Sequence, residues 1–109
     1  MLKSLYIKNY ALIDELFLEF NNGLNIITGE TGAGKSIIVD AFITALGERA
    51  SVNLIRNNQK KAIIEVIFDS NELIIDGYPD INNLLSEQNE LIIRREININ
   101  GNSRCFLND

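Results

Sequence analysis

The feature that most constrains the fold is a glycine-rich segment, Gly29-Glu30-Thr31-Gly32-Ala33-Gly34-Lys35-Ser36. It meets the full pattern G-x-x-x-x-G-K-[ST] of a phosphate-binding loop. Gly32 and Gly34 let the backbone turn tightly, so that its N–H groups can approach phosphate oxygens. In this pattern Lys35 reaches the β- and γ-phosphates, and the Ser36 hydroxyl coordinates magnesium. We therefore expect the segment to bind a nucleoside triphosphate of the ATP type together with Mg²⁺.

The sequence on either side of the loop has the pattern that such a loop needs, an apolar strand before it and a helix after it. Leu24 to Thr28 is a short, mostly apolar run, and Lys35 to Leu46 has apolar residues at helical spacing. Apolar residues also lie on the other sides of this helix, which predicts burial nearly all round. Gly47 follows as a helix stop.

The rest of the chain reads as strands and turns. Alternating or continuous apolar runs predict strands at 5–9, 16–20, 62–68, 91–99 and 103–107. Turns are predicted at 21–23 and 76–79, and a short helix at 80–88. Asn100-Gly101 favours positive φ at both centres of a tight hairpin turn. The expected fold is α/β: a P-loop NTPase fragment with an antiparallel β-lobe beside a strand–loop–helix nucleotide-binding unit.

Composition restricts the class of protein further. The 109 residues suffice for one small domain, and the formal net charge of −5 predicts weak DNA binding by the chain itself. Cys105 is the single cysteine, so no internal disulfide can form, and we expect it to be a small core residue. There is no histidine, which removes the commonest general base and the usual zinc ligand. No apolar run reaches the length of a membrane span and no signal peptide is evident, so we expect a cytoplasmic protein without membrane contact.

Residues that would complete an ATPase site are scarce. Such a site needs a carboxylate for magnesium and usually another to orient water. Asp69 and Asp76 follow apolar runs, but we expect an ordinary strand end and a turn residue, respectively. No catalytic residue is therefore convincing.

Basic residues form two groups. The predicted loop at 48–61 carries local positive charge that could contact DNA, from Arg49, Arg56, Lys60 and Lys61. Around the hairpin, Arg94, Arg95 and Arg104 could touch DNA or phosphate, although a solvated strand face is the expected reading.

Together, these stretches resemble the N-terminal segment of the RecN family of bacterial DNA repair proteins, within the SMC-like group of ABC-type ATPases. The resemblance rests on the loop and on further segments spread along the chain, namely 5–14 with Ala-Leu-Ile-Asp, 18–20, 23–28, 40–41, 46–50 with Leu-Gly-Glu-Arg-Ala, 55–56, 95–97 and 101–104. The sequence departs from the family pattern at Asn102, where an arginine is expected.

The resemblance implies that residues 1–109 are the N-terminal part of an ABC-type ATPase head. It also implies that the Walker B Asp-Glu pair, the signature motif and the coiled coil lie elsewhere in the parent protein. Such heads hydrolyse ATP only when two of them sandwich it. The expected function is ATP binding within a DNA repair and recombination ATPase that acts on double-strand breaks. The implied partners are DNA and a second head half, in a nucleoid-associated parent. The chain alone should bind Mg-ATP without appreciable turnover.

Other readings of the loop remain open. A small intact P-loop NTPase, of the kinase or GTPase type, is the main alternative. A GTPase should carry Asn-Lys-x-Asp, and the nearest segment, 58–61, does not match. An RNA helicase would need Asp-Glu-x-His, and the chain has no histidine. A folded interaction module that binds no nucleotide would be separated from all of these by titration with ATP and GTP.

Overall fold

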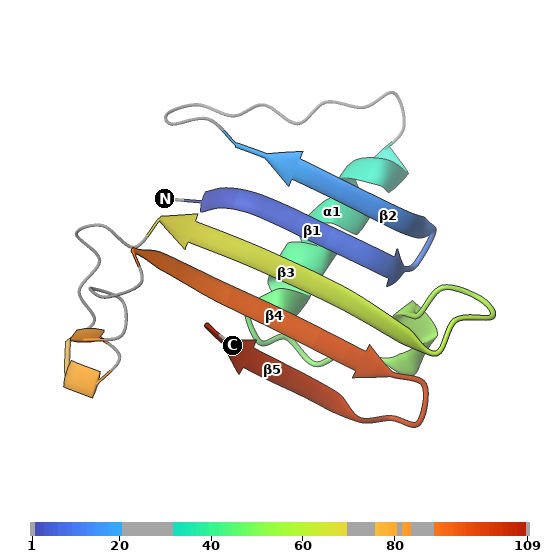
Figure 1. Ribbon diagram of the computed structural model, residues 1–109. Helices are drawn as coiled ribbons and strands as arrows, with labels where there is room; N and C mark the ends of the chain where they lie inside the picture. The colour runs from blue at the N-terminus through green and yellow to red at the C-terminus, as the bar shows by residue number, and fades with distance from the viewer. Residues whose placement is uncertain (1, 21–31, 70–75, 81, 84–88, 109) are drawn as a thin grey trace.

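The described part of the chain is a single antiparallel sheet with one long helix across one face (Figure 1). The computed structural model describes residues 2–20, 32–69, 76–80, 82–83 and 89–108, and of residues 32–35 it describes the backbone. Its elements are β1 (Leu2–Tyr10), β2 (Ile13–Glu19), α1 (Gly32–Ala45), a short 3-10 helix (Val52–Leu54), β3 (Lys61–Asp69), β4 (Glu90–Asn98) and β5 (Ser103–Leu107).

The five strands lie in the order β2-β1-β3-β4-β5, and every neighbouring pair is antiparallel. The N-terminal strands therefore pair with the C-terminal strands, as expected for an antiparallel β-lobe in an α/β fold. All five strands that were predicted within the described residues are confirmed, and β5 has the predicted bounds. The strand predicted at 24–28 and the turn at 21–23 lie outside the described residues.

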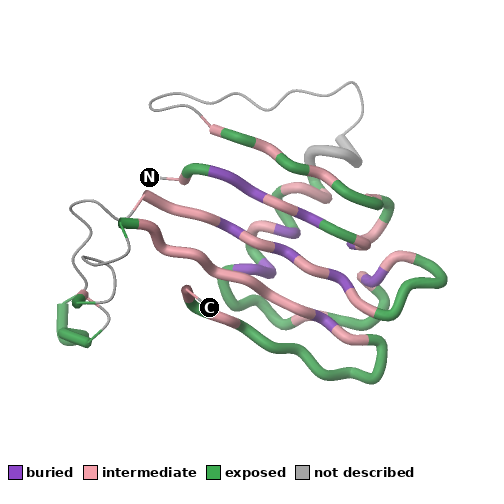
Figure 2. The backbone as a smooth tube through the Cα atoms, in the orientation of Figure 1, coloured by how far each residue is buried: buried purple, intermediate pink, exposed green. Residues whose placement is uncertain are grey.

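The core lies between the sheet and α1. Leu5 of β1 is opposite Val66 of β3, and Ile7 is opposite Ile64. All four side chains are almost fully buried and cluster with Ala41 and Ala45 of the helix. In Figure 2 the buried segments, in purple, lie on the central strands and on the helix behind them. Each such aliphatic side chain contributes about 1.5–3 kcal/mol on burial. Hydrophobic contact between the two central strands and α1 thus fixes the helix on this face.

Helix α1 differs from the predicted helix in two respects. It begins at Gly32 and not at Lys35, so the end of the glycine motif forms its first turn. Its outer face is also open, because Val39 and Ile43 are 50% and 43% exposed, and Leu46, directly after the helix, is 51% exposed. The prediction of burial nearly all round was therefore wrong for the described residues, since the sheet covers only one side of the helix. No helix in the described ranges is long and apolar enough to cross a membrane.

The C-terminal end of α1 is closed by Gly47, as predicted. Gly47 has φ +120°, and its N–H donates to the Thr44 carbonyl at 3.2 Å. The N–H of Glu48 donates to the Ile43 carbonyl at 3.3 Å. This pair of bonds is the Schellman arrangement, which satisfies carbonyls that the helix leaves without partners.

The β4–β5 hairpin forms where Asn100-Gly101 predicted it, but with different turn geometry. Only Gly101 has positive φ, at +97°, whereas Asn100 is not among the described residues with positive φ. The Gly101 N–H donates to the Asn98 carbonyl at 3.0 Å. A three-residue loop with a left-handed glycine is the alternative to a two-residue turn that needs positive φ at both centres.

The segment between β3 and β4 is described only in part. Asp76 and Gly77 form the predicted turn, with Gly77 at φ +84°. Residues 79–80 and 82–83 are helical, and the other residues of the helix predicted at 80–88 lie outside the described part.

Candidate nucleotide-binding site

The second half of the glycine motif forms the start of α1. Gly29, Glu30 and Thr31 lie outside the described residues, while 32–35 form the first turn of α1. The first N–H groups of a helix have no intrahelical acceptor, and the helix dipole places partial positive charge there. That turn carries no acidic residue. The described backbone therefore fits an anion such as a phosphate group.

Ser36 is the one motif residue whose side chain the structure describes. It lies in the helix and is exposed, so its hydroxyl is accessible from solvent. Magnesium prefers oxygen ligands and is usually held by few protein groups together with substrate phosphates. The donor chemistry at Ser36 thus fits a magnesium ion that is shared with a nucleotide.

The two candidate carboxylates have the ordinary positions expected for them. Asp69 is the last residue of β3 and lies opposite Glu90 of β4. Asp76 lies in an exposed turn. Within the described ranges, no group of three or more acidic, cysteine or histidine residues could hold a metal. The structure therefore brings neither carboxylate into a recognisable metal site.

Two of the four basic residues at 48–61 are paired with acidic groups. Arg56 Nη1 lies 3.3 Å from Asp14 Oδ1. Lys61 begins β3, and its Nζ lies 3.4 Å from Glu96 Oε1. These ion pairs reduce the local positive potential that a DNA phosphate would meet.

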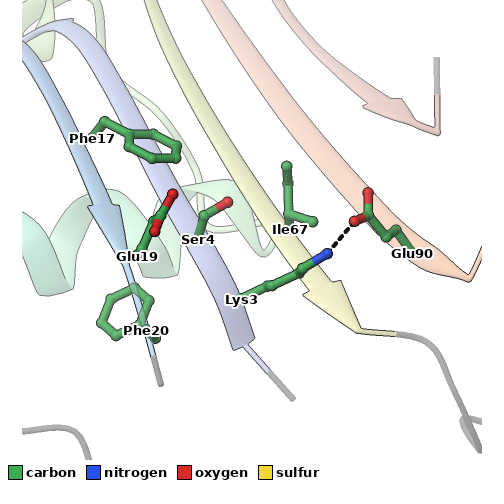
Figure 3. A pocket seen from close by; sticks show the side chains of 7 residues that line it. All are labelled: Lys3, Ser4, Phe17, Glu19, Phe20, Ile67 and Glu90. Atoms are coloured by element: carbon green, nitrogen blue, oxygen red, sulfur yellow. Dashed lines mark hydrogen bonds and ion pairs between the residues drawn. The ribbon is translucent and has the colours of Figure 1, made fainter. Parts of the chain in front are cut away.

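A cleft on the sheet is a poor alternative site for phosphate. It has a volume of about 370 Å³ and is lined by residues of β1, β2, β3 and β4 together with Phe20 (Figure 3). Two carboxylates, Glu19 and Glu90, line it against a single cation, Lys3. Lys3 is already paired with Glu90, and this hydrogen bond raises the pKa of Lys3 above its ordinary value. The acidic lining repels an anion, so the cleft does not compete with the start of α1.

The three arginines near the hairpin have different surroundings. Arg104 is exposed, as expected for a solvated strand face. The Arg94 guanidinium lies 4.5 Å from the ring centre of Phe106. Arg95 lies on the α1 side of β4, and its Nη1 donates to the Thr44 carbonyl at 2.7 Å. Arg95 is half-buried, so the expected solvated strand face describes it only in part.

Cys105 is also placed differently from the prediction. It is exposed on β5, the last strand of the sheet, and not in the core. The alternating pattern of the strand cannot show that α1 does not extend far enough to cover this edge. Nor could the pattern predict the Arg95 contact, because its acceptor is 51 residues away in the sequence.

The sequence is similar to those of known DNA repair proteins. A DNA repair protein RecN from Rickettsia felis is 41% identical over 109 residues, which cover all of this chain and 20% of that protein. The RecN of Bacillus subtilis is 42% identical over 114 residues, which cover 99% of this chain and 19% of that protein. The chain thus spans about one fifth of the length of these relatives. The resemblance to RecN that the sequence predicts is confirmed.

The fold agrees with that of solved ATPase heads. A structure from a study of ATP-driven dimerization and DNA-stimulated activation of SMC ATPases superposes with a TM-score of 0.76 and 26% identity, covering 98% of this chain and 69% of that one. The predicted SMC-like α/β head architecture is therefore confirmed. A family model described as an AAA domain matches residues 4–105. Since this match covers most of the sequence, the chain belongs to the AAA domain family.

Proposed function

We propose that the chain binds Mg-ATP through Gly29 to Ser36, as the N-terminal portion of the head of a DNA repair and recombination ATPase. The observation that carries the proposal is the complete phosphate-loop motif, whose last residues open α1 in a fold that matches an SMC head. Similarity to RecN, which is named as a DNA repair protein, supports a role in DNA repair. The parent protein is proposed to act on DNA double-strand breaks, in the cytoplasm and at the nucleoid.

Each part of the motif has a distinct task in this proposal. Backbone N–H groups from Gly29 onward and the first turn of α1 cradle the phosphates. Lys35 adds a positive charge at the β- and γ-phosphates, and Ser36 supplies one magnesium ligand. The magnesium ion neutralises phosphate charge when it is bound. The chain thus holds and orients the nucleotide, but no residue that the structure describes is a convincing group to activate water.

A second head half is the partner that completes the proposed site. The outer face of α1 exposes the apolar side chains Val39, Ile43 and Leu46 at helical spacing. An apolar face of this kind is typical of a surface that another element covers. The related SMC ATPases are described as dimerizing with ATP and being activated by DNA. We propose that DNA is engaged by the full parent protein, since the −5 charge and the paired loop cations disfavour tight binding by this chain.

Calorimetric titration with Mg-ATP tests the proposed binding site. Lys35→Ala should weaken binding by about 1.5–3 kcal/mol, because it removes a charge-assisted contact to phosphate. Lys60→Ala is the matched control, because it removes the same charge from the loop before β3 and should leave the affinity unchanged. Equal affinity of the wild type and Lys35→Ala would contradict the assignment. A strong preference for GTP would favour the small intact NTPase instead.

A further inference from the structure

Arg95 is a cation on the side of the sheet that faces the core. In the strand register it lies opposite Ile64 of β3, which is fully buried, and opposite Cys105 of β5. Its neighbour on the same face, Ile97, is also buried. Removing a charge from water in apolar surroundings is unfavourable unless the charged group is hydrogen-bonded. Arg95 is half-buried, so the part of its guanidinium that faces the core gains from specific acceptors.

The acceptors of Arg95 lie at the C-terminal end of α1 and on β5. Nη1 donates to the Thr44 carbonyl at 2.7 Å and to the Glu48 carbonyl at 3.0 Å. Nε donates to the Ser103 hydroxyl at 2.7 Å. One planar guanidinium thus joins the end of the helix to the β4–β5 hairpin, a geometry that its fixed fork of donors permits.

The electrostatics of α1 make this contact more than a packing detail. The last turn of the helix contains no basic residue of its own. The C-terminal end of a helix carries partial negative charge, which a cation stabilises. In this fold that cation comes from β4, and it reaches the helix beside the Gly47 turn that closes it.

We infer that Arg95 is a positioning residue for the nucleotide site at the opposite end of α1; this inference rests on the proposed function. Arg95 fixes the C-terminal end of a 14-residue helix, and the first turn of that helix holds the end of the phosphate-binding motif. A helix of this length is a rigid rod of about 20 Å. Loosening one end therefore changes the direction in which the other end presents its N–H groups to phosphate.

The test compares Arg95→Met with Arg94→Met. The two arginines are adjacent on β4, but Arg94 lies on the other face against Phe106 and does not reach the helix by any described contact. At a temperature where all variants are folded, Arg95→Met should weaken Mg-ATP binding roughly twofold to thirtyfold. Amide hydrogen exchange in the last turn of α1 should accelerate in the same variant. Arg94→Met should change neither quantity.

Two further variants keep the test decisive if Arg95→Met folds poorly. Arg95→Lys retains the positive charge but lacks the planar fork, so its affinity should lie between those of the wild type and Arg95→Met. Ser103→Ala removes only the contact with the hairpin and should bind ATP like the wild type. Wild-type affinity in both Arg95 variants, or an equal loss in Ser103→Ala, would overturn the positioning role alone. No ATP binding by the wild type would overturn the proposed function together with this inference.

Discussion

At the scale of single residues, Tyr10 shows how burial sets a measurable property of the core. It is the largest of the fully buried side chains that the structure describes. Burial disfavours the charged phenolate and raises the pKa of Tyr10 above its ordinary value. In the unfolded chain the phenol should instead titrate near pH 10, which is about the pKa of tyrosine in a model peptide. The folded state therefore binds the Tyr10 proton more tightly than the unfolded state.

This difference predicts a loss of stability in alkali. The contribution of Tyr10 is fully present below about pH 10 and is lost as the pH rises through the higher folded pKa. One such group changes the free energy of unfolding by at most about 1.4 kcal/mol per pH unit. Tyr10→Phe cannot ionise, so its urea-unfolding free energy should fall less steeply above pH 10. Tyr78→Phe, at an exposed position, is the control and should follow the wild type. Parallel curves for Tyr10→Phe and the wild type would contradict the account.

At the scale of elements, the sequence predicts the strands well because their signals are local. Alternation of apolar residues marks β1, a mostly apolar run marks β3, and Gly101 marks the last hairpin. Local sequence patterns do not predict burial or contacts that depend on a neighbouring element. The apolar pattern of α1 could not show that only one of its sides meets the sheet, nor could the strand pattern of β4 show that Arg95 reaches Thr44. The phosphate-binding motif itself was recognisable because spacing and residue types within eight positions define it.

An isoleucine-to-alanine change should have unequal effects on the two sides of α1, between helix and sheet and on the open face. Ile64→Ala, at a fully buried site facing the helix, should lower the free energy of unfolding by about 2–5 kcal/mol. Ile43→Ala, on the open face, should change it by less than about 1 kcal/mol, because alanine also has the higher helix propensity. Thermal unfolding of the chain measures both effects.

Binding of the second head half tests the outer face of α1. If it covers the outer face of α1 as proposed, Ile43→Ala should weaken its association with the chain. Ser51→Ala, at the cap of the 3-10 helix, is an exposed control on another surface and should leave association unchanged. Unaltered association of Ile43→Ala would show that this face is not the contact.

At the scale of the whole molecule, the sheet and helix form a platform that presents one end of α1. The strand order brings the two ends of the chain into one sheet, so the hairpin of β4 and β5 stabilises a helix that precedes it by many residues. The described part contains no recognisable metal-binding cluster, and two of the four basic residues of the loop at 48–61 are paired with acidic groups. In our account this platform holds ATP, and catalysis depends on groups from a partner.

The most direct test of the account measures bound ATP and released phosphate in the same sample, with Mg²⁺ present. The chain alone should hold nucleotide while phosphate release stays near the buffer blank, since phosphoryl transfer needs a water-orienting group and further charge stabilisation. Adding the second head half should start Mg²⁺-dependent turnover, and Lys35→Ala should abolish it. Absence of bound ATP would contradict the central claim. Turnover by the chain alone that Asp69→Ala or Asp76→Ala stops would show instead that this is a small intact NTPase.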